Sequence, residues 1–418
     1  MLLDYGIIIC SIFILIEIIA FFWIRWVREK FQWLIISSDK KPNLSHKDLE
    51  KFFEHGFDEE LGWVRKSNTN HEEKGKEGTV KWTTNEIGAR TNPNFDSKKP
   101  LISCYGDSFT FCRQVNDNQT WEYFLSESLN QNVVNFGVGN HGIDQSLIRI
   151  KREFPKNRTK IVILGVVPDT ISRILSCWKH YCEYGNTFAF KPRYKIQDDE
   201  LVLVKNFIDK KEKFSAYSNY LKTIQENDYF YNKKFKKEII TFPYSLTVFR
   251  NPKRNFGIIF WITRNFILKN IGISTKFFDW RPMQIIMKIN LKLRISLFHD
   301  ESAIKLFQKI ISAYIEYAKQ ENFIPIFTLL PQKDDLLSIK KSKNFVKEFS
   351  NELKNMPNLH YIDIIEKLLD DKHLDDKHLD DMYSDDNDYG GHFSEEGNKV
   401  IAKIIKQFLE EEKIIHEV

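Results

Sequence analysis

Short apolar runs and longer amphipathic segments alternate along most of the chain after residue 100. An uncharged run of four to eight residues is typical of a strand buried on both faces, and apolar residues that recur every three or four positions are typical of a helix. The runs that predict strands are 101–106, 132–138, 160–167, 323–331 and 359–364, and the segments that predict helices are 118–129, 143–154, 301–320, 334–355 and 398–412. Strands that alternate with helices predict an α/β fold, a doubly wound three-layer sandwich with about five parallel strands.

The alternation stops between the third and the fourth predicted strand, and we interpret residues 170–300 as an insertion. Residues 205–297 contain 19 Lys and Arg against 6 Asp and Glu, interleaved with Phe, Tyr and Trp. Two interpretations stay open: a solvated helical cap, or a surface that faces anionic lipid headgroups or an anionic substrate. Within this part, residues 255–273 mix apolar and basic side chains as a helix at a membrane interface would.

The N-terminal segment has a third pattern, one uninterrupted apolar run. Residues 5–24 contain a single charged residue, Glu17, and three basic residues follow within the next six positions. About twenty apolar residues are the length that crosses a bilayer as a helix. The acidic start and the bulky residues after the run are unlike a cleavable signal peptide, so we expect a retained membrane anchor over residues 1–29. The basic flank after the anchor predicts a cytoplasmic location for the remaining chain.

Composition and charge limit the class of protein. Of the 418 residues 42% are hydrophobic, which is enough for a sizeable core. The net charge of +5 is modest for this length and no nucleic-acid motif accompanies it, so we expect no nucleic-acid partner. Residues 30–98 are polar and irregular, and we expect them to form a lead-in that packs beside a main domain over residues 99–418.

Neither the cysteines nor the histidines predict a metal site. The five cysteines lack metal-ligand spacing and are too few for a disulfide scaffold. Residues 371–381 contain a five-residue tandem duplication that places His373 and His378 beside aspartates. We interpret this segment as an acidic, solvated loop.

Candidate chemistry follows the predicted strands. Ser108, in CYGDSFTF, comes two residues after the first strand, the glycine-rich segment 135–145 follows the second, and His392 precedes the final helix. The carboxyl ends of parallel strands are where ligands bind in a doubly wound sheet. Acyl transfer needs a serine oxygen, an imidazole that takes its proton, a carboxylate that orients the imidazole, and backbone donors for the oxyanion. Ser108, His392, Asp388 and the 137–142 loop are the candidates for these roles, although each motif alone is more often an ordinary turn.

Taken in order, three segments resemble the sequence blocks of the GDSL/SGNH hydrolase superfamily: GDSFTF, NFGVGNHGIDQ and HFSEEGNKVIA. The resemblance covers about residues 100–412 apart from the insertion. ELGWVRK and EIGARTNP also resemble segments that precede the serine block in membrane-linked members. The resemblance implies a flavodoxin-like fold with esterase, lipase or carbohydrate acyl-ester activity, and no metal or organic cofactor.

The same resemblance implies roles for individual residues. Ser108 would be the nucleophile, its backbone N–H an oxyanion donor, and His392 the general base. The second oxyanion donor would come from the 137–142 loop, at Gly139 or Asn140. Where the family usually has glycine, this chain has Asn140, which a backbone N–H donor tolerates.

The third block departs from the family pattern. It usually ends in Gly-x-Asn-Asp, and the asparagine supplies a third oxyanion donor. Here the block reads LGVVPDT, with Val167 and Pro168 at that place. Loss of one such donor costs about 10²–10³ in rate unless another side chain replaces it. Asn140 and the residues of the insertion are the candidates for a replacement.

The catalytic acid is the second departure. In the family it stands three residues before the histidine, and this chain has Tyr389 there. Asp388 is the nearest candidate and Asp386 the next, while some members work with a Ser-His dyad alone.

The leading hypothesis is a membrane-anchored serine esterase that acts on O-acyl groups of a glycan or a lipid, with an acyl-ester substrate as its partner. An O-acyltransferase would use the same acyl-enzyme and a different acceptor. The rival from another class is a catalytically weak member that serves as a binding or assembly protein at the membrane.

Overall fold

The structure is a computed structural model that describes residues 2–30, 35–40, 44–75, 78–370, 376–384 and 388–415. The chain forms two compact units, each built from separate stretches of sequence. We call them the sheet unit (Lys47–Leu175, Lys191–Phe214 and Leu293–Val418) and the helical unit (Met1–His46, Ser176–Phe190 and Ser215–Lys292). The predicted insertion is therefore divided, and residues 191–214 belong to the sheet unit.

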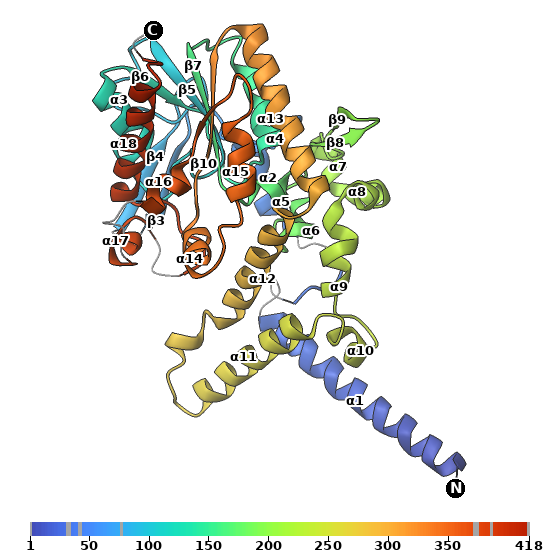
Figure 1. Ribbon diagram of the computed structural model, residues 1–418. Coiled ribbons are helices and arrows are strands. Elements are labelled where there is room, and N and C mark those ends of the chain that lie inside the picture. Colours follow the sequence, from blue (N-terminus) through green and yellow to red (C-terminus); the bar gives the residue numbers. More distant parts are fainter. Residues whose placement is uncertain are drawn as a thin grey trace. The chain divides into compact units, whose positions relative to one another are not determined.

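A five-stranded parallel sheet forms the centre of the sheet unit (Figure 1). Its strand order is β11-β10-β7-β5-β6, and every neighbouring pair is parallel. The strands are β5 (Pro100–Gly106), β6 (Asn132–Asn135), β7 (Ile161–Val166), β10 (Ile324–Leu329) and β11 (His360–Ile362). The chain moves from β5 to one side and then crosses to β7 on the other, so the strand order reverses beside β5. The predicted doubly wound α/β fold is confirmed.

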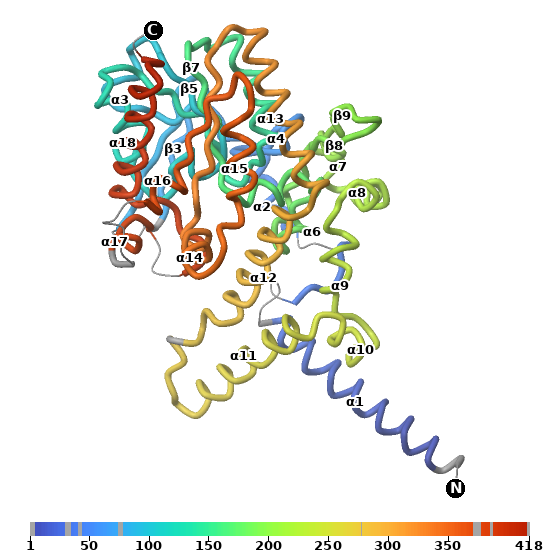
Figure 2. The backbone as a smooth tube through the Cα atoms, viewed as in Figure 1, coloured from blue at the N-terminus to red at the C-terminus, as the bar shows by residue number. Residues whose placement is uncertain are grey.

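Helices cover this sheet. Every residue of β6 and β7 is buried, as expected of strands that are covered on both faces. Helix α3 (Trp121–Leu129) contacts β6 and α18 (Glu395–Glu411), and Figure 2 shows α3 and α18 side by side although about 270 residues separate them in the chain. Helix α4 (Ile143–Glu153) contacts β5, β7 and α13 (Glu301–Glu321).

One predicted helix is two helices in the structure. Residues 334–355 form α14 (Lys333–Lys341) and α15 (Lys347–Lys354), with a break around Ser342. Ser342 is extended, with φ −151° and ψ −167°, and the Asn344 side chain accepts a hydrogen bond from the Val346 N–H at 3.1 Å. Short polar side chains of this kind compete with helical hydrogen bonds, and they end α14 here.

Arg90 joins the lead-in to the main domain. Its guanidinium is buried and donates to the carbonyl oxygens of Phe111, Cys112 and Val115 and to the Asp117 carboxylate. These contacts hold the loop that follows Ser108. The other elements of the sheet unit are α2 (His46–His55), β1 (Phe57–Asp58), β2 (Gly62–Trp63), β3 (Asn70–Gly75), β4 (Gly78–Thr83), η1 (Asp117–Gln119), α5 (Thr170–Arg173), β8 (Arg193–Gln197), β9 (Glu200–Val204), α7 (Lys211–Ser215), α16 (Ile364–Asp370) and α17 (Asp376–Asp381).

The helical unit begins with α1 (Leu2–Lys30), whose segment Tyr5–Glu29 is long and apolar enough to cross a membrane. A core that includes Ile24, Val27, Ile258 and Ile262 packs the end of α1 against α11. The other elements are α6 (Lys179–Cys182), η2 (Tyr217–Tyr220), α8 (Leu221–Asn227), η3 (Tyr231–Phe235), α9 (Lys236–Glu238), α10 (Tyr244–Val248), α11 (Pro252–Asn270) and η4 (Lys276–Phe278), and α12 (Arg281–Leu297) has residues in both units.

Candidate active site

Ser108 lies directly after β5, where the strand order reverses. A Cβ added to Gly106 would be 1.7 Å from the carbonyl oxygen of Gly165, so the close approach of β5 to β7 requires glycine at this place. Asp107 is fully buried and accepts hydrogen bonds from the Phe109 N–H, the Val167 N–H and the Arg173 guanidinium, each at 2.9 Å. The Asp107 carboxylate therefore holds the serine turn to the end of β7.

His392 meets Ser108 from the other end of the sequence. The distance from His392 Nε2 to Ser108 Oγ is 2.8 Å. The backbone of His392 is paired with Ser384, which donates its N–H to the His392 carbonyl at 2.8 Å and accepts the His392 N–H on its hydroxyl at 3.2 Å. Ser394 caps the N-terminus of α18 through the Gly397 N–H, as its position before two glutamates predicts. The turn that carries the imidazole is thus held on both sides.

The second ring nitrogen of His392 faces an amide. Gln114 Oε1 lies 3.3 Å from His392 Nδ1 and also accepts a hydrogen bond from the Ser384 hydroxyl. An amide oxygen can only accept, so this contact requires the proton on Nδ1 and leaves Nε2 free to accept the proton of Ser108.

The structure does not bring the candidate acid Asp388 to His392. Asp388 is exposed and makes no hydrogen bond or ion pair with His392 in the part of the chain that the structure describes. Two glycines with left-handed backbone, Gly390 (φ 75°) and Gly391 (φ 76°), separate Asp388 from His392 and turn the chain between them. Asp386 lies outside the described residues.

Burial sets the protonation state of the histidine. Burial, together with the positive charges of Arg113 and Arg173, lowers the pKa of His392 from 6.5 to about 3, and Glu73 opposes the shift. The imidazole is therefore neutral near pH 7, which is the form that a general base requires.

Backbone donors lie beside the serine hydroxyl. The N–H groups of Ser108 and Gly139 have no acceptor among the residues that the structure describes. A Cβ built on Gly139 would be 3.9 Å from the Cβ of Ser108, so this loop passes close to the nucleophile. Asn140 is exposed and has a left-handed backbone with φ 67°. Gly139 is therefore the better placed of the two predicted loop donors.

Trp63 of the lead-in anchors that loop. Its indole N–H donates to the Gly139 carbonyl at 2.8 Å, and its own carbonyl is 2.8 Å from Nε2 of His141. The sequence hypothesis did not assign Trp63 a role. Its one signal in the sequence was its place in ELGWVRK, a segment that resembles those preceding the serine block.

Arg65 is a second residue that the sequence hypothesis missed. Its guanidinium carbon lies 4.6 Å from the ring centre of Trp82 and 5.0 Å from that of Phe111. Its Nη2 is 3.7 Å from the point that a Cβ of Gly139 would occupy. The Nε atom is buried without a hydrogen-bond partner among the described residues.

The place of the family's third donor is occupied differently here. The Val167 N–H donates to Asp107, and Pro168 has no N–H. Neither residue therefore offers a donor to an oxyanion.

No metal site accompanies these residues. The described ranges contain no group of three or more His, Cys, Asp or Glu that could hold a metal ion. His373 of the duplicated segment lies outside those ranges, and His378 lies in α17.

Comparisons with known proteins find likeness only among solved structures. No family model matches the chain, and no curated protein sequence matches it. One structure, assigned to the G-D-S-L family of lipolytic proteins and from Desulfitobacterium hafniense DCB-2, is 15% identical, covers 74% of this chain and 99% of its own, and has a TM-score of 0.34. Another, assigned as an acylhydrolase and from Bacteroides fragilis NCTC 9343, is 12% identical, covers 77% and 91%, and has a TM-score of 0.30.

Proposed function

We propose that this chain is a membrane-anchored serine esterase that hydrolyses O-acyl groups of a glycan or a lipid. The observation that carries the proposal is the 2.8 Å contact between Ser108 Oγ and His392 Nε2, at the carboxyl end of β5 and at the point where the strand order reverses. The resemblance to the GDSL/SGNH blocks supports the same chemistry.

In the proposed reaction Ser108 Oγ attacks the ester carbonyl carbon while His392 Nε2 takes the hydroxyl proton. The carbonyl oxygen becomes an oxyanion that the N–H groups of Ser108 and Gly139 stabilise. The C–O bond to the leaving alcohol then breaks, and His392 returns the proton to that oxygen. Water attacks the acyl-enzyme by the same route in reverse and releases the carboxylic acid and free Ser108.

Gln114 makes this site weaker than one with a carboxylate. It fixes the tautomer of His392, but its neutral amide does not stabilise the imidazolium that forms in the transition state as a charge would. This feature, with the absent third-block asparagine, supports the rival proposal of a catalytically weak binding protein. Transfer to a sugar hydroxyl would proceed through the same acyl-enzyme, and product analysis distinguishes it from hydrolysis.

A fluorophosphonate probe tests the proposal on the full chain in detergent. We expect it to label the parent protein, and we expect Ser108→Ala and His392→Ala to abolish labelling. Ser128→Ala is the matched control, because the Ser128 hydroxyl bonds only the Leu125 carbonyl in α3. A folded parent that is not labelled contradicts the esterase and favours the binding protein.

A further inference from the structure

A carboxylate lies in the middle of the apolar N-terminal helix. Glu17 is only 6% exposed, and its two oxygens accept the N–H groups of Tyr244 at 2.6 Å and of Ser245 at 2.8 Å. These are the first two residues of α10, and N–H groups in the first turn of a helix have no partner within the helix. Glu17 therefore caps α10 from within α1.

The position of Glu17 along α1 gives the depth of this contact. It is twelve residues from each end of the segment Tyr5–Glu29, which is about 18 Å at the rise of an α-helix. The hydrocarbon layer of a bilayer is about 30 Å thick. When α1 spans a bilayer, Glu17 and the start of α10 lie near its midplane.

The outer surface of α10 suits that environment. Leu246 of α10 is 58% exposed, and Phe242 and Phe249, which flank the helix, are 70% and 64% exposed. Just before α10 the Thr247 hydroxyl donates to the carbonyl of Thr241 and accepts its N–H, so both backbone groups of Thr241 are paired, as hydrocarbon demands. Large apolar side chains at such exposure indicate a surface that faces lipid or a partner.

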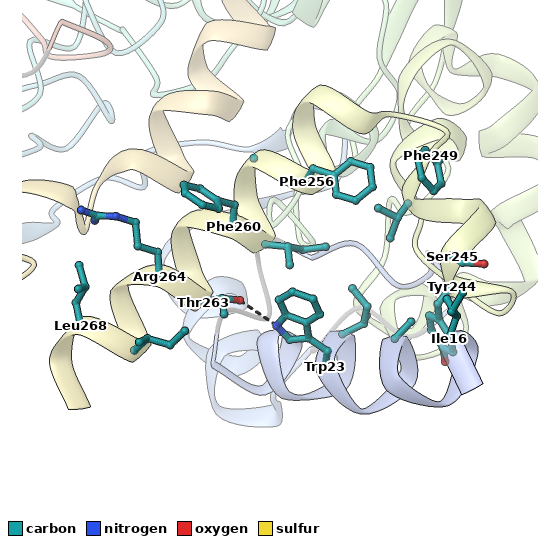
Figure 3. Close-up of a pocket in the computed structure, with 16 residues that line it drawn as sticks. Ile16, Trp23, Tyr244, Ser245, Phe249, Phe256, Phe260, Thr263, Arg264 and Leu268 are labelled. Carbon is teal, nitrogen blue, oxygen red and sulfur yellow. Dashed lines mark hydrogen bonds between the residues drawn. The ribbon is translucent and has the colours of Figure 1, made fainter. Parts of the chain in front are cut away.

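An apolar groove continues from this surface between α1, α10 and α11 (Figure 3). Its volume is about 940 Å³, and Trp23 crosses it with an indole N–H that donates to the Thr263 hydroxyl at 2.9 Å. The walls are mostly aliphatic and aromatic, with Ile16, Ala20, Phe256 and Phe260 among the lining residues. Ser245, Thr263 and Arg264 also line the groove. The groove runs along α1 at the depth of the hydrocarbon layer, where the available apolar ligand is an acyl chain.

We propose that α10 and α11 form a re-entrant element that enters the hydrocarbon layer beside α1, and that the groove between the three helices holds an acyl chain of a membrane lipid. The proposal rests on the membrane anchoring proposed above. Glu17 then acts as an internal cap that satisfies the re-entrant backbone, which explains an acid in an otherwise apolar span.

Nitroxide depth measurements in phosphatidylcholine vesicles test the re-entrant element. The full chain carries Cys10→Ser, because Cys10 is exposed and the other four cysteines are buried, and one label at Leu246→Cys, Ile14→Cys or Lys222→Cys. We expect the label at position 246 to meet oxygen and to be shielded from an aqueous nickel chelate, as at position 14. A label at 246 that is as accessible to nickel as at 222 overturns the re-entrant element, and aqueous exposure at 14 overturns the anchor itself.

The role of Glu17 is tested by the same label. Glu17→Leu removes both acceptor oxygens and Glu17→Gln keeps one, so we expect the label at 246 to move toward the aqueous surface most in Glu17→Leu. An unchanged depth in Glu17→Leu overturns the capping role.

A phosphatidylcholine with a photoreactive acyl chain tests the groove. We expect crosslinks on the groove face of α11, and we expect Ala20→Phe to reduce them severalfold by filling the space. Ile9→Phe, on an exposed position of α1, is the matched control. Equal crosslinking in Ala20→Phe overturns an acyl chain in the groove.

Arg65 carries a second inference from different residues. Burial, with the charges of Arg113 and Arg90, lowers the pKa of Arg65 to about 10, and Glu73 opposes the shift. Glu73 is already paired with Arg113 at 2.9 Å, and no hydrogen bond or ion pair joins Arg65 to another described residue. An unpaired guanidinium in a partly buried site is costly unless an anion joins it.

That guanidinium borders the space beside the nucleophile. From the point of a Gly139 Cβ, Arg65 Nη2 is 3.7 Å away and the Cβ of Ser108 is 3.9 Å away. No side chain of residue 139 stands between them, and the rings of Trp82 and Phe111 fix the guanidinium. We infer that Arg65 supplies the third donor to the oxyanion, in place of the absent third-block asparagine.

Hydrolysis of p-nitrophenyl butyrate, a neutral ester, tests this role and depends on the proposed esterase. We expect Arg65→Gln to lower kcat on the order of 10²-fold with little change in KM, and Arg65→Lys to recover part of the loss. We also expect guanidinium ions in solution to restore Arg65→Ala, which a purely structural role would not allow. Arg158→Gln, at an exposed ion pair with Glu321, is the control.

The outcomes separate the two hypotheses. An inactive parent contradicts the esterase. If the parent is active and folded Arg65→Gln has a normal kcat, only the role of Arg65 is contradicted. The same holds if Arg65→Gln changes nothing but the KM for esters that carry a negative charge.

Discussion

Gln114 Oε1 lies 3.3 Å from His392 Nδ1, at the place where a serine hydrolase has the carboxylate that orients its histidine. The contact comes from the loop after the nucleophile, whereas Asp388, four residues before the histidine in sequence, is exposed. The imidazole of His392 is therefore oriented by the neutral amide of Gln114.

The first prediction concerns a carboxylate in place of the Gln114 amide. We expect Gln114→Glu to raise the rate of fluorophosphonate labelling on the order of tenfold, because a carboxylate stabilises the imidazolium. Gln114→Leu removes the acceptor and is expected to lower the rate. Gln131→Glu, at an exposed position, controls for added charge. A slower Gln114→Glu in a folded protein would contradict the assigned role of Gln114.

The pH dependence follows from the pKa of His392. Since burial lowers this pKa to about 3, the base is neutral across the ordinary range. We expect the labelling rate to stay nearly constant as the pH falls from 8 to 5 and to decline only as it approaches about 3. Gln114→Glu should move that decline to higher pH, because the carboxylate favours the protonated ring. A decline centred near pH 6.5 would show that His392 is solvated.

The lowered pKa of His392 also affects the free energy of unfolding in acid. A histidine whose folded-state pKa is lowered destabilises the folded chain as the pH falls from 6.5 toward 3, because the unfolded chain binds the proton first. We expect the free energy of unfolding to fall less over this range in His392→Asn than in the parent. Chemical denaturation at several pH values measures the difference, and identical pH profiles would refute it.

Asp107 is expected to position Ser108 through its buried contacts. Asp107→Asn breaks the buried ion pair between Asp107 and Arg173, although Arg173 keeps the longer contact with Asp169 at 3.3 Å, and breaking a buried ion pair costs about 3 kcal/mol. We expect a corresponding loss in the free energy of unfolding together with slower labelling. Asp199→Asn, in an exposed ion pair with Lys305, should change the free energy of unfolding far less, because solvent screens exposed pairs. Equal effects of the two variants would contradict the role of Asp107.

Trp63 offers a test of the oxyanion loop. Trp63→Phe keeps the ring but loses the hydrogen bond to the Gly139 carbonyl, which stabilises the fold by about 1 kcal/mol. We expect a severalfold slower labelling rate because the Gly139 N–H is held less firmly. Trp178→Phe loses an equivalent bond to the Thr187 carbonyl in the helical unit, and should lower stability without slowing labelling. Similar rates in the two variants would contradict the anchoring of this loop.

Much of the architecture was predictable from local pattern. The runs that form β5 and β7 carry almost no charge because both of their faces are covered. This apolar pattern is visible directly in the sequence. The serine and histidine motifs were found for a similar reason, since they lie in turns directly beside regular elements. The break at Ser342 was missed because a short polar interruption does not disturb the helical spacing on either side of it.

The partners of the site were decided only by tertiary structure. No local feature marks Gln114, and only their place in the ELGWVRK segment marks Trp63 and Arg65. Each of the three meets the site through a contact with a residue distant in sequence. Likewise the sequence shows Glu17 only as the single charge of an apolar run, and its partners are two N–H groups of α10 that lie 227 and 228 residues away. The sequence by itself determined which segments become strands and helices, because periodicity is local. Which polar group faces which was determined by packing, because hydrogen bonds and ion pairs depend on distances that only the folded chain defines.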